Sequence, residues 1–334
     1  MDWSKGYSAS YYVKEVDPVT WRDKSTIEIT GGTIKRTLTG LRNSASINCL
    51  TDLGGIEKWI RIYMDTNQEG DYGHEALFTG IAASPKRKAY ASRNERTPDC
   101  YSVLKPADDV ILSHGWFALA GSNSGEVVRA LLSVTPAPVV VADNAPSLSS
   151  TIIAEDGETH LTMVDRVLTA IGWRIDIAGD GTINVKPYSA DPVEKLDPTS
   201  VDVIEVPISI TEDWFSAPNV YMAISGDMTG IARDDRDESP LSVQNRGREV
   251  WRVESGVTLS ANETIAEYAT RQLQAAQRVR KQVSYDRRFM PHIRVGDVIN
   301  LHYPAQNIDG MFFVSSQSIR IGYNARTSES AEEI

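Results

Sequence analysis

The chain has 334 residues, of which 41% are hydrophobic and 24% are charged, fractions that are ordinary for a soluble globular protein of two or three domains. Its formal net charge of −11 argues against a surface built to grip nucleic acid, although an acidic wall would let DNA pass nearby without trapping it. The first residues lack the basic start and apolar run of a signal peptide, and no apolar stretch approaches the ~20 residues of a membrane span. We therefore expect a soluble protein that is made in a cytoplasm and does not insert into a membrane.

The first third of the chain has the pattern of a β-barrel or sandwich. Aromatic residues crowd the first 24 positions, which predicts an N-terminal strand or arm packed on its own barrel or on a neighbour. Short strands are predicted at residues 26–29, 33–39, 44–50, 59–64, 76–82, 88–93 and 100–104, with Gly31 and Gly32 between the first two. Cys49 and Cys100 fall in two of these strands, which favours buried free thiols over a disulfide or a metal pair. Residues 1–120 are thus predicted to form one barrel domain.

Residues 121–198 have the content of a small α+β domain followed by a linker. Ser122 or Ser124 is a candidate cap for a short helix that carries Val127, Val128, Leu131 and Leu132. A second helix begins near Thr159 and ends at Gly172. Residues 173–185 alternate in polarity and predict a hairpin that turns on residues 180–181. The polar, proline-bearing residues 187–198 are typical of a linker.

Residues 199–334 combine strands with one long helix. Residues 217–227 predict a strand, and residues 227–248 are acidic without an apolar pattern, which predicts a long mobile loop ordered only by a partner. The helix is predicted over residues 261–281, with Ser260 and Glu263 forming a capping box. Its predicted packing face, against a barrel sheet, consists of Ile265, Ala269, Leu273 and Ala276. Three strands follow, at residues 283–288, 298–302 and 311–321, with turns at residues 296–297 and 307–310.

The order of elements in residues 217–322 resembles the C-terminal part of the central hub proteins of bacteriophage tails. The resemblance is carried by the strand at residues 217–227, the long helix before the closing strands, and two short segments. The first segment runs from Ile293 to Leu301 around Val-Gly-Asp-Val, and the second is Gly-x-Phe-x-Val-x-Ser at Gly310 to Ser316. This family includes the baseplate hubs of contractile tails, their prophage relatives, the type VI secretion spike and the N-terminal region of siphophage tail-tip proteins.

The resemblance implies a mainly β fold in which two tail-tube-like β-barrel domains, residues 1–120 and 199–334, flank the α+β domain. It implies a structural hub, a homotrimer whose two barrels per subunit make a pseudo-sixfold ring that joins the tail tube to the tip or spike. Such a ring lets DNA or a tape-measure protein through. The implied partners are the tail tube or distal tail protein, spike or fibre proteins, the tape-measure protein, and DNA in transit without sequence-specific binding. The implied location is the virion, at the tail tip or baseplate, after assembly in the host bacterial cytoplasm.

No catalytic or ligand-binding constellation stands out in the sequence. None of the five histidines is at the i, i+4 spacing of a helical zinc pair. They are His74, His114, His160, His292 and His302. The acidic run at residues 234–238 lacks the glycine and the distal glutamate of a calcium-binding loop. Asn123 stands where a nucleophile elbow needs serine, and Gly31 and Gly32 are too sparse for a phosphate-binding loop. We therefore predict no enzyme, no cofactor, and no catalytic, cofactor-binding or metal-binding residue.

Two alternatives stay open. A tail-associated peptidoglycan hydrolase or endopeptidase would need an acid pair or a Cys/His site that only folding assembles, and a pocket of converging titratable groups would favour it. A receptor-binding adhesin module is suggested by the acidic stretch and the tyrosines, and a shallow aromatic patch at a distal tip would favour it. Threefold contacts along barrel edges would favour the hub.

Overall fold

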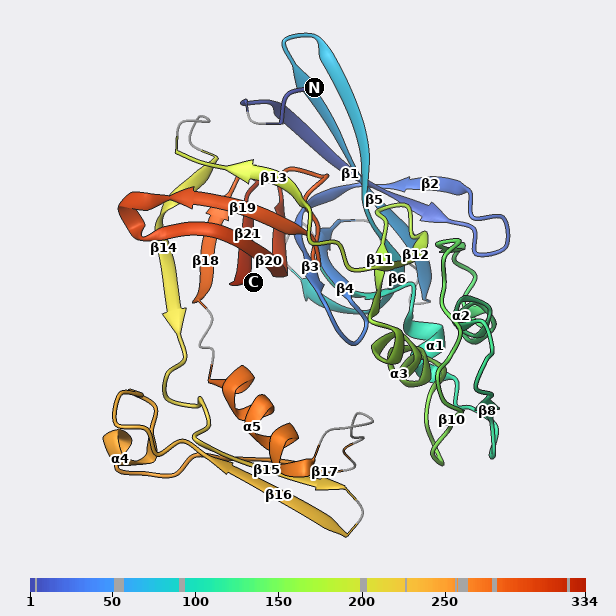
Figure 1. The fold of residues 1–334 in the computed structure, drawn as a ribbon. Coiled ribbons are helices and arrows are strands. Elements are labelled where there is room, and N and C mark those ends of the chain that lie inside the picture. Colours follow the sequence, from blue (N-terminus) through green and yellow to red (C-terminus); the bar gives the residue numbers. More distant parts are fainter. Residues whose placement is uncertain are drawn as a thin grey trace. The chain divides into compact units, whose positions relative to one another are not determined.

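The structure is a computed structural model that describes residues 1–3, 5–50, 57–89, 94–198, 203–225, 227–255, 257, 264–277, 281–322 and 325–334. At residues 84–89, 94 and 95 it describes the backbone alone. The chain forms two compact units, each with its own core (Figure 1). Unit 1 comprises Met1–Ile208 and Ser284–Ala331, and unit 2 comprises Ser209–Val283 and Glu332–Ile334. None of the described helices is long and apolar enough to cross a membrane.

A sheet of 13 strands is the main element of unit 1. Its strands are β1 (Ser8–Val16), β2 (Asp23–Ile27), β3 (Ile29–Thr37), β4 (Asn43–Cys49), β5 (Lys58–Gln68), β6 (Asp71–Ala89), β7 (Asn94–Ser102), β13 (Pro192–Leu196), β14 (Ile204–Glu212), β18 (Lys281–Arg287), β19 (Val298–Tyr303), β20 (Ile308–Ile321) and β21 (Thr327–Glu333). They are ordered β14-β18-β21-β20-β3-β4-β7-β6-β5-β1-β2, and β19 branches from β20 and carries β13. The first and last strands of the chain therefore share one sheet.

The predicted mainly β fold is confirmed, but the two predicted barrels are not. The path of described strands ends at β14 on one side and at β2 on the other, so the sheet is open at both edges. The pairing of β20 with β3 also joins the C-terminal part of the chain directly to the N-terminal part, which separate barrels would not do. The division into residues 1–120, 121–198 and 199–334 stays a prediction.

Local sequence explains the middle of this sheet. Every second residue of β4 from Ala45 to Cys49 is buried, as the period of 2 predicts. Gly31 and Gly32, however, lie inside β3 and not between two strands. A Cβ atom at Gly32 would stand 2.5 Å from the carbonyl oxygen of Ser46 on β4. Glycine is needed at this position for the close approach of the neighbouring strand, not for a turn.

Other strand boundaries differ from the prediction for equally local reasons. The predicted strands at residues 76–82 and 88–93 belong to one long strand, β6, which runs to Ala89, and residues 90–93 lie outside the described part. Strand β20 begins at Ile308, because the turn before it is made by the 3₁₀ helix η1 (Pro304–Gln306) and by Asn307 in the left-handed conformation.

The chain between β7 and β13 forms the predicted α+β part. Its elements are α1 (Lys105–Asp109), β8 (Phe117–Ala118), α2 (Ser124–Leu132), β9 (Val139–Val141), β10 (Ile152–Ile153), α3 (His160–Ile171), β11 (Trp173–Ile177) and β12 (Ile183–Pro187). Thr159 caps α3 and Gly172 ends it, both as predicted. Helix α2 is capped by Asn123, which replaces the predicted Ser122 or Ser124 because its side chain accepts the Glu126 amide.

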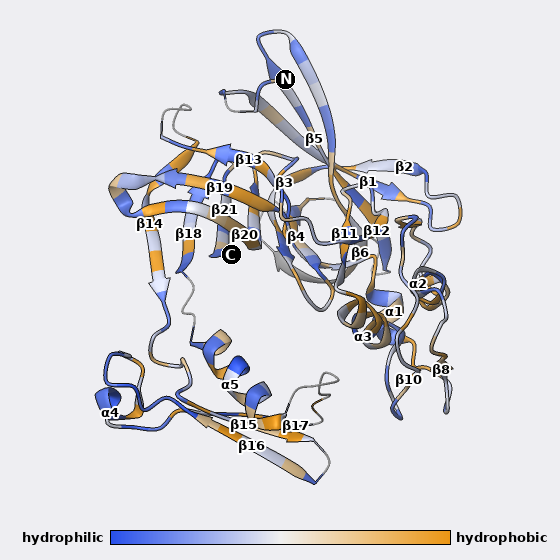
Figure 2. Ribbon diagram, in the orientation of Figure 1, coloured by the Kyte–Doolittle hydropathy of each residue, from blue (hydrophilic) through white to orange (hydrophobic). Residues whose placement is uncertain are grey.

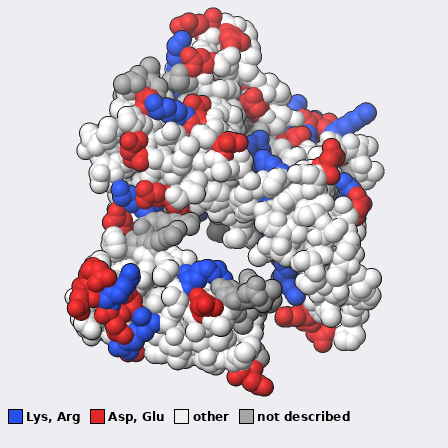
Figure 3. All heavy atoms as spheres, viewed as in Figure 1, with Lys and Arg blue, Asp and Glu red and all other residues white. Residues whose placement is uncertain are grey.

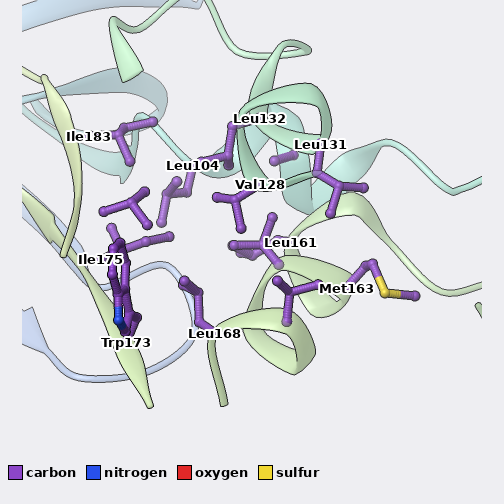
Figure 4. Close-up of a cluster of buried hydrophobic side chains, with 14 of the residues drawn as sticks. Leu104, Val128, Leu131, Leu132, Leu161, Met163, Leu168, Trp173, Ile175 and Ile183 are labelled. Atoms are coloured by element: carbon purple, nitrogen blue, oxygen red, sulfur yellow. The ribbon is translucent and has the colours of Figure 1, made fainter. Parts of the chain in front are cut away.

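This part has its own apolar core, which the two helices and the hairpin share. The buried side chains of α2 and α3 meet those of β11 and β12 (Figure 4). Figure 4 labels Leu131 of α2, Leu161 of α3 and Ile175 of β11 among these side chains. Strands β11 and β12 pair antiparallel around the predicted turn, and β12 also pairs with β9 in parallel.

Unit 2 contains a three-stranded sheet of its own, and helix α5 packs on one face of that sheet. Its elements are β15 (Val220–Ser225), β16 (Met228–Arg233), α4 (Val243–Arg246), β17 (Trp251–Ser255) and α5 (Ile265–Ala276), and the strand order is β16-β15-β17. Helix α5 is shorter than predicted, since Gln277 is its C-cap and Lys281 begins β18. Its capping box is formed by Thr264 and Glu267. The predicted capping pair, Ser260 and Glu263, lies outside the described residues, as do residues 278–280.

The predicted packing face of α5 is confirmed for its central residues. Ala269 and Leu273 are buried together with Tyr268, and Ile265 packs against them. The sheet beneath is β16-β15-β17 and not the one that contains β18 to β20, so the predicted partner of the helix is wrong. At Gly230 of β16, a Cβ atom would stand 2.5 Å from the Ile265 carbonyl oxygen, so the close approach of the helix requires glycine on the strand.

Replacing Leu273 by alanine is expected to lower the free energy of unfolding of unit 2 by about 2–3 kcal/mol. This lies in the lower part of the range for buried leucines, because a small core beside solvent can partly close around the gap. Denaturant unfolding of the whole protein measures it. Gln274→Ala, one residue further along the exposed face of α5, is the control and should change stability by less than ~0.5 kcal/mol. Equal stabilities for the two variants would contradict the assigned face.

Candidate functional site

The residues examined as possible metal ligands or nucleophiles do not gather in the structure. Each histidine has a separate partner: His74 with Asp65, His114 with Asp156, His160 with the Leu131 carbonyl, His292 with Glu194 and His302 with Asp309. Among the described residues, no three His, Cys, Asp or Glu side chains are grouped as a metal ion requires. Cys49 and Cys100 are buried thiols that are not linked in a disulfide bond, as predicted.

The hollows found in unit 1 do not have the shape or the chemistry of a hydrolase cleft. One of about 420 Å³ has Asp286 as its carboxylate, and another of about 420 Å³ has Glu205, which is paired with Arg326. A smaller one of about 310 Å³ has no carboxylate. None of these three hollows holds the two facing carboxylates that glycoside hydrolysis needs.

The acidic stretch predicted to be a mobile loop is folded, and that prediction is wrong. Residues 227–248 contain β16 and α4, and Asp234 is only 4% exposed. Its carboxylate accepts hydrogen bonds from Arg236 (2.8 Å), Ser239 (2.6 Å) and Gln277 (2.9 Å). The hydrogen bond from Arg236, helped by Ser239 against the effect of burial, holds the pKa of Asp234 well below its usual range. Acidic and basic side chains gather over this region in Figure 3.

The buried side-chain amide of Asn219 also holds this region in place through hydrogen bonds. Asn219, at the start of β15, is fully buried and donates through Nδ2 to the carbonyls of Leu241 (3.1 Å) and Arg248 (2.9 Å). Its Oδ1 accepts the amide of Val250 at 2.7 Å. The region is therefore tied together by hydrogen bonds within its own chain.

The Val-Gly-Asp-Val turn is a binding site for a side chain of the α+β part. Arg174 of β11 donates to the Val295 carbonyl at 2.7 Å and to Asp297 at 2.6 Å. A Cβ atom at Gly296 would stand 1.8 Å from the Arg174 guanidinium, and Gly296 has a φ of +89°. The positive φ selects glycine here, and a Cβ atom would in addition displace the Arg174 guanidinium from its hydrogen bonds. Sequence reasoning identified a turn but missed this contact, although the motif itself was its signal.

A second ion pair reinforces this docking from the opposite direction. Arg294 donates to Asp176 of β11 at 3.3 Å, and Lys186 of β12 donates to the other oxygen of Asp176 at 2.7 Å. Burial by itself would raise the pKa of Asp176, but the Arg294 and Lys186 charges outweigh burial and hold that pKa below its usual value. In one contact the α+β part supplies the arginine and the turn supplies the aspartate, and in the other the roles are reversed. Two ion pairs of opposite direction therefore hold the α+β part on the sheet.

The tip of the β11–β12 hairpin inserts against β5 and β6. Thr79 donates to the Gly179 carbonyl at 2.7 Å, while Arg61 and Trp21 donate to the Asp180 carbonyl at 2.9 Å and 3.1 Å. A Cβ atom at Gly179 would stand 1.7 Å from the carbonyl oxygen of Ala76. The turn is therefore packed directly on the backbone of the sheet.

A buried ionic cluster lies between β18, β20 and β21. Arg287 and Glu329 form an ion pair of 2.6 Å, and both side chains are fully buried. Tyr285 and Gln317 also donate to Glu329, each at 2.6 Å. Burial, together with the charge of Glu329, raises the pKa of Tyr285 well above its usual value. Every member is hydrogen-bonded within the protein, so the cluster is a structural element and not a reactive site.

The other face of the same strands is polar and is built from short side chains. On β18, β21, β20, β3 and β4 the residues that alternate with the core are mostly serine or threonine. This hydroxyl face consists of Ser284, Asp286, Ser328, Ser330, Ser316, Ser318, Arg320, Thr33, Lys35, Ser44, Ser46 and Asn48. The hollows of about 420 and 310 Å³ at Thr33 lie on it. The face is therefore continuous across five strands.

Unit 2 exposes an apolar sheet face on the side away from α5. Strand register places Ile231, Met222 and Val253 in one row across β16, β15 and β17. Hydrophobic stretches of these three strands are orange in Figure 2. In the next row the exposed Trp251 lies beside Val220, which is itself buried. Ile231, Val253 and Trp251 are 53%, 58% and 47% exposed. A contiguous exposed apolar face of this kind marks a contact surface.

The comparison with solved structures identifies the fold. The chain has the fold of phage and prophage tail proteins. In particular, 98% of it is similar to 98% of the 43 kDa tail protein of prophage MuSo2 from Shewanella oneidensis, with a TM-score of 0.68 and 12% identity. A tail protein from Neisseria meningitidis matches with a TM-score of 0.68 and 16% identity, over 98% of this chain and 97% of that one. A chain of the Francisella PdpA–VgrG complex matches 98% of this chain with 58% of its own length, a TM-score of 0.57 and 9% identity.

Sequence comparison does not add to this identification. No protein-family model matches the chain, and no curated protein matches it. The resemblance inferred from residues 217–322 is thus confirmed through the fold, which relates nearly all of this chain to nearly all of two tail proteins.

Proposed function

We propose that the protein is the structural hub of a phage or phage-like tail, a trimer that joins the tail tube to the tip or spike. The observation that carries this proposal is the fold match over the full length of two tail proteins. Because the match includes both units and the α+β part, it does not rest on one widespread sheet motif. The role is that of a scaffold located in the virion, after assembly in the host bacterial cytoplasm.

Surfaces that lack a partner in the single chain support an assembled role. Among the described strands, those at the two ends of the unit 1 sheet are β14 and β2, and open strand edges are ready to pair with another chain. The apolar face of unit 2 likewise needs a cover. In the proposed ring, further copies and the neighbouring tail tube, distal tail, spike or fibre proteins supply these contacts. The closed barrels of a tail tube would then arise in the assembly and not in one subunit.

The hydroxyl face supports the proposed passage of DNA or a tape-measure protein. Most of its side chains are short hydroxyl groups, and its few charges are of both signs, with Asp286 opposed by Lys35 and Arg320. A strongly basic wall would hold a polyanion, which a conduit must avoid. The opposite face of these strands is occupied by the core, so the hydroxyl face is the one left to line an axis.

The hollows of unit 1 support this role over that of a hydrolase. They bring no pair of carboxylates together, and the described histidines and cysteines stand apart from one another. Residues 227–248 are folded and do not form the mobile acidic loop that suggested a receptor-binding adhesin.

The proposal is tested on the purified protein and on the particle that contains it. Mass measurement is expected to give a trimer, and class averages of the particle a central threefold ring. Monomer at every concentration together with no ring in the particle would contradict the hub. In the ring, a Ser318→Cys side chain should react with a small maleimide but not with one attached to a globular protein, whereas Ser113→Cys on the exposed α+β part should react with both. Cys49 and Cys100 are buried and give little background.

A further inference from the structure

A small polar cavity lies where the α+β part meets the sheet. Its volume is about 30 Å³, and it is lined by Arg36 and Arg42 from the β3–β4 hairpin, Asp176 from β11, and Arg294 before the Val-Gly-Asp-Val turn. A space of this size accommodates one water molecule or one ion of similar radius. None of the roles described above uses it.

Positive charge is in excess around this cavity. Its lining contains three guanidinium groups and one carboxylate, that of Asp176, which Lys186 and Arg294 already neutralise. Arg42 has Asp165 as its partner. Arg36 is 8% exposed, and within the described part of the chain it donates to two neutral groups, the Leu77 carbonyl at 3.0 Å and the Gln317 side chain at 3.4 Å. Asp176 and Asp297 act on Arg36 through space, but both carboxylates already pair with other cations, so positive charges outnumber negative ones around the cavity.

Polar atoms beside the cavity also lack partners. The Nε atom of Arg42 and the Oδ1 atom of Asn43 are buried without a hydrogen-bond partner among the described residues. Both residues line the cavity, and they are 9% and 7% exposed. Unsatisfied buried groups of this kind point to an unseen water or ion. Rotation of the Asn43 amide by half a turn would present its Nδ2 donor to the same space.

We propose that the cavity binds a single halide ion, chloride under ordinary conditions, which balances Arg36 and fixes the α+β part on the sheet. A water molecule would satisfy the orphaned Arg42 and Asn43 atoms but would leave the charge of Arg36 uncompensated. Chloride supplies both the acceptor and the charge, and the guanidinium and amide groups donate to it. The site is independent of the proposed tail role, since it requires only the folded chain.

Halide dependence of unfolding tests the site in the whole protein. At constant ionic strength, replacing a large organic anion by chloride is expected to raise the unfolding midpoint by at least ~2 °C, because the ion binds the folded state alone. Arg36→Gln removes the excess charge and should abolish this dependence, even if its own midpoint is lower. Arg320→Gln, an exposed arginine on the hydroxyl face, should retain it. Equal midpoints of the unmodified protein in the two anions would overturn the proposal.

Diffraction from crystals soaked in bromide provides a test that does not depend on any variant. An anomalous peak is expected within hydrogen-bond distance of Arg36 and Arg42. Bromide peaks confined to the outer surface would indicate an adventitious ion only, and a cavity with no anomalous signal would indicate water. Either result would overturn the proposal.

Discussion

Replacing Glu329 by glutamine is expected to lower the free energy of unfolding of unit 1 by about 3–5 kcal/mol. The substitution preserves the shape of the side chain but leaves the Arg287 guanidinium, which is fully buried, without its opposite charge. Tyr285 and Gln317 also lose the charged acceptor to which both donate. Chemical denaturation followed by intrinsic fluorescence measures the change.

The same strand offers the matched control. Glu332, three residues after Glu329 on β21, is exposed, and Glu332→Gln should change the free energy of unfolding by less than ~0.5 kcal/mol. A double variant, Arg287→Met with Glu329→Leu, should recover much of the loss, because an apolar pair of similar volume often replaces a buried ion pair without cost. If Glu329→Gln were as stable as Glu332→Gln, the ion pair would not be the element that holds β18 and β21 together.

Gly179→Ala is expected to destabilise unit 1 by about 3–5 kcal/mol, through overpacking and through hydrogen bonds lost by buried groups. The new Cβ atom would stand 1.7 Å from the Ala76 carbonyl oxygen, and a backbone atom cannot move aside as the end of a flexible side chain does. Displacing the hairpin tip also breaks the bonds from Thr79 to Gly179 and from Arg61 to Asp180. Thermal unfolding, together with proteolysis of the hairpin, measures the effect.

This experiment needs a control that distinguishes the loss of any glycine from the loss of the glycine at position 179. Gly6→Ala is the control, since a Cβ atom there would meet nothing within 4 Å. Gly179 has no unusual φ, so a difference between the two variants reports on contact with β6 and not on backbone strain. Similar midpoints for both variants would mean that the hairpin tip is not packed on the sheet as described.

The parts of this fold that were predictable are those set by residues close in sequence. The alternation along β4, the caps of α3 and the apolar stripe of α5 each arise within one element, where period and capping chemistry act. The hairpin of β11 and β12 was predictable for the same reason, because its turn residues select the pairing of adjacent strands.

The parts that could not be predicted depend on residues far apart in sequence. Glu329 meets Arg287 and Gln317 only because β21 lies between β18 and β20. The partner sheet of α5 was misjudged because an amphipathic stripe indicates that a helix is buried but not which strands bury it. Asp234 looked like part of a solvated acidic run, because Gln277, which donates to its carboxylate, is 43 residues away and is brought to it by folding.

The burial of Cys49 and Cys100 bears on how readily the protein is oxidised. Cys49 and Cys100 lie on the core side of β4 and β7, and burial, aided by the charge of Asp99, raises the pKa of the Cys100 thiol. Since oxidants attack the thiolate, a thiol that stays protonated and enclosed resists sulfenic acid formation and exchange with external disulfides. Both sulfurs are therefore expected to stay reduced while the folded protein is kept in air-saturated buffer.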